Sequence, residues 1–222
     1  MKNTRQISNP YREVGILHNE GLDYVIKNLN PKEPVTIEKV IELVSQYLLT
    51  VKNTTAKSEL ALYYEFIATT INGLNQIPFQ EFLREGKVSK EGVCFINDIQ
   101  NISPDFDYQT TLKVLHNIET NILSSDMTEQ EKQFPLLSVA VAKSSVEYWI
   151  KQINDPKSLW IPFVGDPKAF KWPWKSDANG AVAGAIGGAI GGVVGGIGGV
   201  LIGGLLGAIG GAIGASVADA LF

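Results

Sequence analysis

Near its C-terminal end the chain carries glycines at a regular four-residue spacing, a pattern that few folds can use. Sixteen of its 22 glycines lie between residues 180 and 214, mixed almost wholly with alanine, valine, isoleucine and leucine. Residues four apart share one face of a helix, so a run of such glycines predicts a groove into which another helix packs closely. One ladder consists of Gly187, Gly191, Gly195, Gly199, Gly203, Gly207 and Gly211, and a second of Gly180, Gly184, Gly188, Gly192 and Gly196.

The glycine-rich region also lacks formal charge. Asp177 and Asp219 enclose 41 residues, 178–218, without an acidic or basic side chain. In water, each glycine inside a helix costs about 1 kcal/mol relative to alanine. In hydrocarbon, an unpaired backbone group costs several kcal/mol, so a helix forms there whatever its propensity. The composition therefore favours lipid as the surroundings of this segment.

The length of the uncharged segment predicts a helical hairpin. One straight helix of that length would reach about 60 Å, roughly twice the hydrocarbon thickness of a bilayer. Two spans of about 20 residues fit better, with a turn expected near Gly195–Gly199, the stretch with the densest glycines. Aromatic and lysine side chains precede the segment and predict an anchor at the membrane interface, with lysines favouring the cytoplasmic side; the expected anchors are Trp160, Trp172, Trp174, Lys171 and Lys175.

Three other interpretations of the segment remain open at this point. It could be a hairpin buried inside a water-soluble shell, a disordered low-complexity tail, or an aggregating tail. A disordered tail is the less favoured, because regular four-residue spacing has no purpose in a coil. Packing in a protein core is an equally expected fate for Trp149 and Trp160.

The preceding residues predict helices and no strands, so the expected fold class is all-α: a helical bundle body followed by a Gly/Ala-rich hydrophobic helical hairpin. The expected division is a body over 1–154, a linker rich in Trp, Pro and Lys over 155–176, and the hairpin over 177–222. Helices are expected after Asn9-Pro10, from Thr36, over 56–74, 78–84 and 89–99, after Ser103-Pro104, and after a Thr128–Glu131 capping box, the last one bent or started late at Pro135.

Charge and cysteine usage exclude several classes of protein. The segment upstream of residue 178 holds 19 basic and 22 acidic side chains, a balance of −3, which argues against a nucleic-acid surface. The single cysteine, Cys94, has apolar neighbours and is expected to be a buried thiol. The first residues lack the apolar core of a secretory signal peptide. We therefore expect cytoplasmic synthesis, then post-translational insertion or non-classical export, and a membrane-associated protein.

The sequence offers no catalytic or metal-binding motif. His18 and His116 are its only histidines, and neither has a second ligand at metal-binding spacing. The polar cluster His18-Asn19-Glu20 is expected to serve a surface or capping role. We therefore expect no enzymatic activity, no metal and no cofactor.

The glycine-rich segment is similar to glycine-zipper domains of bacterial membrane proteins and to the Gly/Ala-rich ends of small bacteriocins that insert into target membranes. The order of parts, a helical body carrying an uncharged hairpin, resembles pore-forming colicins, in which helices hide the hairpin until it meets a membrane. The Asn-Pro-Tyr at 9–11 and the His-Asn-Glu-Gly-Leu-Asp-Tyr at 18–24 look like the start of bacterial proteins without an assigned activity.

These features together predict a membrane-inserting protein, bacteriocin-like or pore-forming, whose partner is the lipid bilayer. The glycine ladders predict a homo-oligomer, and the helical body is a candidate to bind a protein partner. One alternative is a resident membrane-anchored adaptor with a harmless anchor. Another is a soluble assembly protein with a buried hairpin.

Overall fold

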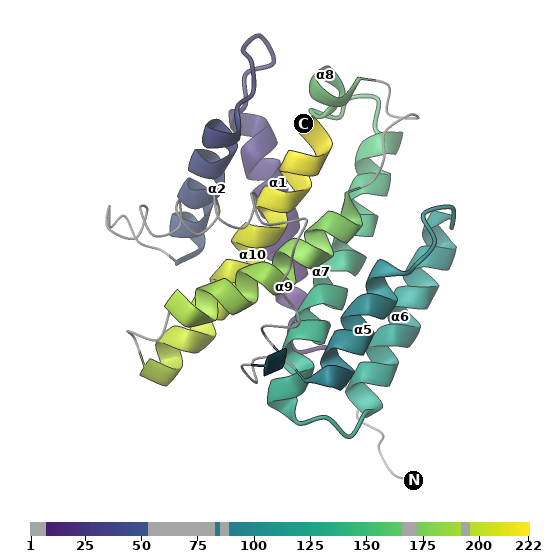
Figure 1. Ribbon diagram of the computed structural model, residues 1–222. Coiled ribbons are helices and arrows are strands. Elements are labelled where there is room, and N and C mark those ends of the chain that lie inside the picture. Colours follow the sequence, from purple (N-terminus) through teal and green to yellow (C-terminus); the bar gives the residue numbers. More distant parts are fainter. Residues whose placement is uncertain (1–7, 53–82, 85–88, 166–172, 192–195) are drawn as a thin grey trace.

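The computed structural model describes residues 8–52, 83–84, 89–165, 173–191 and 196–222, and every regular element in these ranges is an α-helix (Figure 1). This confirms the predicted all-α fold class. The helices expected over 56–74 and 78–84 lie outside the described residues, apart from 83–84, which are helical. With the labels of Figure 1, the helices are α1 (Arg12–Asn28), α2 (Ile37–Lys52), α5 (Lys90–Gln100), α6 (Tyr108–Ser124), α7 (Glu129–Asn154), α8 (Ile161–Val164), α9 (Trp174–Gly191) and α10 (Gly196–Leu221).

Local capping explains where several helices begin. The predicted capping box of α7 is present: the Thr128 backbone N–H donates to Glu131 Oε2 over 2.8 Å, and Thr128 Oγ1 accepts from the Glu131 N–H. The expected start of α6 at Ser103-Pro104 is wrong. Ser103 instead opens a turn, and Asp107 caps α6 by accepting the Thr110 N–H over 2.8 Å.

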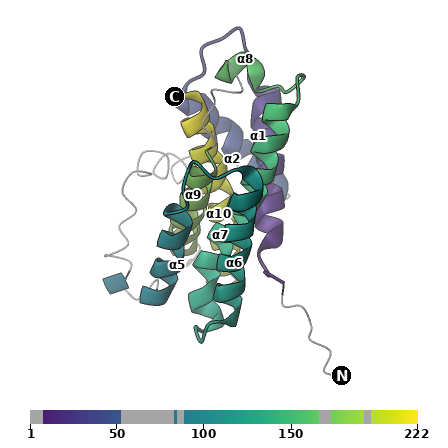
Figure 2. The ribbon, with the colours of Figure 1, turned by 90° about the vertical axis from the view of Figure 1, so that its right-hand side faces the viewer.

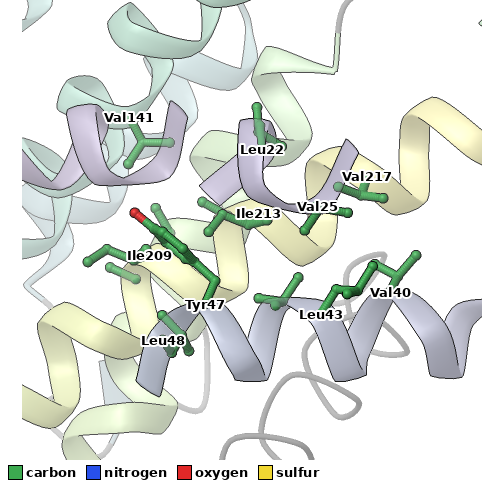
Figure 3. Packing of buried hydrophobic residues seen from close by; sticks show 14 of the residues in the cluster. Leu22, Val25, Val40, Leu43, Tyr47, Leu48, Val141, Ile209, Ile213 and Val217 are labelled. Carbon is green, nitrogen blue, oxygen red and sulfur yellow. The ribbon is translucent and has the colours of Figure 1, made fainter. Parts of the chain in front are cut away.

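The largest core lies where α1 and α2 close over α10 (Figure 3). Branched aliphatic side chains from the three helices interdigitate there, and α7 adds Val141 from the side. Such side chains fill a helix-helix interface without polar atoms, and each contributes about 1.5–3 kcal/mol on burial. The labelled members from α1, α2 and α10 are Leu22, Val25, Val40, Leu43, Tyr47, Leu48, Ile209, Ile213 and Val217.

A second cluster joins α5 and α6 to the other side of α7, where the three helices lie side by side (Figure 2). It includes Ile99, Leu115 and Leu136, and it also takes in Trp174 and Ala178 from the start of α9. The two arms of the hairpin have different neighbours: α9 packs mainly on α7, and α10 packs on α1 and α2, while α1 also packs directly on α7 (Figures 1 and 2).

Two expectations about α5 and α7 are corrected. Cys94 is exposed on α5, not buried, because its helix turns Val93 and Ile96 inward instead. Helix α7 starts at Glu129 and continues through Pro135, so the proline does not delay its start. Gly92 of α5 packs over this proline: a Cβ on Gly92 would lie 3.4 Å from the Glu131 carbonyl oxygen.

The expected linker at 155–176 holds more regular structure than its composition indicates. It contains α8, which ends at Val164 and is followed by Gly165 with a φ of 72°. It also contains the first turn of α9, from Trp174 onward. The main core also crosses the expected boundary at residue 176, since Trp160, Ala181 and Ile209 belong to one cluster. The body, linker and hairpin therefore differ in composition, but residues from all three contribute to one hydrophobic core.

Candidate functional site

Helices α9 and α10 form an antiparallel hairpin packed through bare backbone. A Cβ on Gly180 would overlap the carbonyl oxygen of Gly211, and a Cβ on Gly184 would overlap that of Gly207. A Cβ on Gly211 would lie 3.0 Å from the Gly184 Cα. Side chains at these positions would force the helices apart, so the two glycine ladders make the contact between the arms of one hairpin.

The register of this contact pairs glycine with glycine along the hairpin. The two observed pairs, 180 with 211 and 184 with 207, share the sum 391. The sequence continues this pattern with glycine at 188 and at 203, the next two positions of the same register. Helical periodicity thus explains why Gly180 and Gly184 of one ladder face Gly211 and Gly207 of the other.

The other glycines predicted to pack are located here by the helix that contains them. Gly187, Gly188 and Gly191 lie in α9, and Gly196, Gly199 and Gly203 lie in α10. Gly192 and Gly195 lie outside the described residues. The turn expected at Gly195–Gly199 is wrong for 196–199, which are already helical, because α9 ends at Gly191 and α10 begins at Gly196.

Of the predicted interfacial anchors, Trp160 and Trp174 are buried inside the protein, and Lys175 is partly buried. Trp160 is 2% exposed, packs on Trp149 with ring centroids 4.8 Å apart, and donates from Nε1 to Tyr148 Oη over 2.8 Å. Trp174 is buried against the α5–α7 layer. Lys175 Nζ donates to the Gln100 carbonyl oxygen over 2.9 Å, at the end of α5. Lys171 and Trp172 lie outside the described residues.

A buried polar cluster ties the hairpin to the bundle at the start of α9. Asp177, His18 of α1 and Ser145 of α7 have no exposed surface. Ser145 Oγ donates to Asp177 Oδ2, and His18 Nε2 lies 3.6 Å from the same oxygen. Ser216 of α10 and Trp149 of α7 also lie near the carboxyl and favour its ionised form, although among the described residues Ser216 Oγ makes no hydrogen bond. Four helices thus bring their polar groups to one acid.

Burial sets the protonation state of this cluster. Burial raises the pKa of Asp177 to about 8, helped by the negative charge of Asp219, while the Ser145, Ser216 and Trp149 donors oppose the rise. Burial lowers the pKa of His18 to about 4, while its hydrogen bond to Asn19 opposes the fall. At neutral pH the acid is therefore protonated and the imidazole is neutral.

The hydrogen bonds of Asn19 orient the imidazole. Asn19 Nδ2 donates to the Ser144 carbonyl oxygen over 2.9 Å, which leaves its Oδ1 facing His18 Nδ1 at 2.9 Å. The neutral ring therefore carries its proton on Nδ1 and directs the Nε2 lone pair toward Asp177. Within the part of the chain that the structure describes, no hydrogen bond reaches His18 Nε2. At neutral pH the pair therefore holds one titratable proton, which lies on the Asp177 carboxyl.

This combination of serine, histidine and acid is not arranged as a nucleophilic triad. In a triad the histidine lies between the serine and the acid and takes the serine proton. Here Asp177 lies between Ser145 and His18, and all three side chains are shielded from solvent. The geometry suits a proton held at a packing contact. Among the described residues, no group of three His, Cys, Asp or Glu side chains is placed to hold a metal.

The expectation of a surface or capping role is wrong for His18, which is fully buried. From the sequence, Asp177 only marked the start of the uncharged run. The 9–24 segment instead fastens α1 to its neighbours. Asn9 Nδ2 donates to Glu119 Oε1 and to the Leu136 carbonyl oxygen, each over 2.9 Å. Gly21 lets α1 approach α10, since a Cβ there would overlap the side chain of Ile213. A charge at the start of an otherwise uncharged apolar helix was the available signal for the cluster.

Comparison of the chain with protein-family models, with curated proteins and with solved structures finds no match.

Proposed function

We propose that this protein is a membrane-inserting effector that stores its hydrophobic hairpin inside a water-soluble helical bundle and transfers it to a lipid bilayer. The observation that carries the proposal is the self-contained packing of α9 on α10 through glycine backbone. A hairpin held together in this way keeps its internal contact when the surrounding helices leave. It can therefore move from protein to lipid as a unit.

The composition of the second arm supports a lipid destination. Among the described residues, the window Gly204–Leu221 of α10 is the one stretch long and apolar enough to cross a bilayer. Asp219 is its single charged residue and lies near its end. In the bundle, 72% of this window is buried, so the surrounding helices hide the apolar surface from water.

The same burial favours a second candidate function, a soluble assembly protein in which the hairpin is a permanent core. A core helix of a soluble protein has the same length and composition as a membrane span. The two functions differ in whether the hairpin leaves the bundle. A disulfide that fixes the hairpin to the body, and that can be reduced again, tests which of them holds.

This disulfide uses the close approach of α1 to α10. The Ile213→Cys change removes the Cδ1 atom that a Cβ on Gly21 would overlap, and a disulfide to Gly21→Cys would tie α10 to the body. The Tyr47 ring, 2.8 Å from that Cβ, has to move aside in the double-cysteine chain, oxidised or reduced. The exposed Cys94 is replaced by serine. The oxidised chain should neither float with phosphatidylcholine/phosphatidylglycerol vesicles nor release their trapped dye. Reduction of the same sample should restore both, so the reduced chain is the matched control.

The unmodified chain supplies the decisive result. Flotation together with dye release supports insertion, and flotation without release would favour a passive membrane anchor over a pore. If the unmodified chain neither floats nor releases dye at any lipid composition or pH, membrane insertion is wrong and the permanent-core function takes its place.

Association of inserted hairpins into an oligomer is part of the proposal. Gly187 and Gly191 of α9 belong to a ladder of glycines at four-residue spacing, and small residues so spaced let a neighbouring helix approach closely. Dye release that rises more steeply than linearly with protein concentration would support association, and a strictly linear dependence would contradict it.

A further inference from the structure

We propose that the contact of His18 with Asp177 and Ser145 is a latch that keeps the hairpin inside the bundle. The latch is closed while the Asp177 carboxyl carries its proton, and loss of this proton releases the hairpin. This inference rests on the proposed membrane insertion and concerns how pH controls it.

The position of the cluster makes it suitable as a latch. Asp177 is the last charged residue before the uncharged run, and the body contributes His18 from α1 and Ser145 from α7 to hold it. Most of the remaining interface between hairpin and body is apolar. Apolar contacts change little with pH, whereas a buried carboxylate without a counter-charge is costly. The cluster is therefore the point at which solution conditions can act on the interface.

The described groups around Asp177 do not balance the charge of its carboxylate once the proton is lost. From α10 the nearest charge is Asp219, which is also negative, and from α7 the neighbouring groups are Ser145, Trp149 and Tyr148, all neutral. Among the described residues that act on the Asp177 carboxyl, His18 is the one that can become positive, and its burial opposes this. Deprotonation thus leaves a carboxylate among hydroxyl and indole donors. Movement of α9 into water or a headgroup layer removes the free-energy cost of burying this carboxylate.

The direction of the pH effect follows from counting protons. In the released state the two groups regain their ordinary pKa values of 3.8 and 6.5, while in the closed state they lie near 8 and 4. Between pH 4 and 6.5 both states hold one proton, so closure is independent of pH there. Between pH 6.5 and 8 only the closed state holds it, so closure weakens about tenfold per pH unit, or about 30-fold across that interval.

Single replacements should give opposite pH profiles. In Asp177→Asn only His18 titrates, so closure should strengthen from pH 4 to 6.5 and be flat above. In His18→Gln only Asp177 titrates, so closure should weaken throughout pH 4 to 8. The double replacement should be flat. Exposed positions supply the matched controls, His116→Gln and Asp98→Asn, which should keep the profile of the unmodified chain.

The experiment measures flotation of each full chain with phosphatidylcholine vesicles, whose net charge is constant, at half-unit pH steps. The free energy of unfolding in urea is measured at the same pH values without vesicles. The latch is supported if Asp177→Asn abolishes the rise in vesicle binding between pH 6.5 and 8. It is overturned if this variant keeps the profile of the unmodified chain in both measurements.

The two measurements separate the latch from the function on which it rests. If no chain floats but the unfolding profiles of the variants differ as described, membrane insertion fails, and the cluster controls only stability. If all chains float with one pH profile, insertion stands and the latch fails. A variant too unstable for flotation is judged by the His18→Gln, Asp177→Asn double replacement, whose pH-independent binding or lack of it decides the question.

Discussion

At the scale of single residues, absent side chains matter as much as present ones. Gly184 brings two helix backbones together where any Cβ would overlap the Gly207 carbonyl oxygen. Close packing then supplies dispersion contacts that larger side chains supply elsewhere. Asp177 acts in the opposite way, as a polar group whose burial costs free energy and gives the interface its dependence on pH.

The glycine contact predicts an inverted response to alanine. Gly184→Ala adds helix propensity, yet it should lower the free energy of unfolding by about 1–3 kcal/mol, because the overlap forces the arms apart. Gly92→Ala is the matched control: a Cβ there would lie 3.1 Å from the Ser89 hydroxyl, which can shift slightly, and 3.4 Å from the nearest backbone atom, so the loss should be smaller. Urea unfolding of both chains checks this. Equal stabilities for the two would show that the backbone contact is looser than described.

At the scale of elements, helix boundaries follow hydrogen bonds that the sequence specifies only in part. The box at Thr128 and Glu131 was visible as a spacing and is present. Ser103-Pro104 showed an equally plausible start signal, but the chain turns once more before Asp107 begins α6. Two competing caps within five residues differ mainly in tertiary context, which local spacing does not contain.

The two cap positions predict different costs. Thr128→Ala should lower the free energy of unfolding by about 1 kcal/mol, because it leaves a first-turn N–H of α7 without its acceptor. Ser103→Ala should change it by only a few tenths of a kcal/mol, since Ser103 lies outside any helix. Thermal unfolding followed by circular dichroism measures both. A larger loss for Ser103→Ala would restore the cap expected from sequence.

At the scale of the whole molecule, the hairpin is structural as well as hydrophobic. The α1, α2 and α10 side chains form one cluster, and the start of α9 completes the other. In water the bundle and hairpin therefore depend on each other. This dependence also means that a soluble state need not expose the apolar arms.

The shared core predicts the outcome of truncation. A chain ending at Ser176 loses Ile209, Ile213 and Val217 from the centre of the main cluster, and the loss of several buried aliphatic side chains exceeds the usual stability of a domain. It should show no cooperative urea transition and no near-ultraviolet dichroism from its tryptophans. A cooperative transition would show that the body folds alone.

The sequence by itself determined the features that depend on local periodicity and composition. Period-3.6 apolar stripes, the Thr128 box and the glycine ladders each reflect interactions within about one helical turn, so the all-α class and a close helix contact in the tail could be predicted from them. Only the tertiary structure decided that the ladders meet each other in one register, that Trp160 and Trp174 are buried, and that His18 meets Asp177. Those contacts join residues far apart in the chain, and no short-range pattern specifies which distant face an apolar or polar side chain will find.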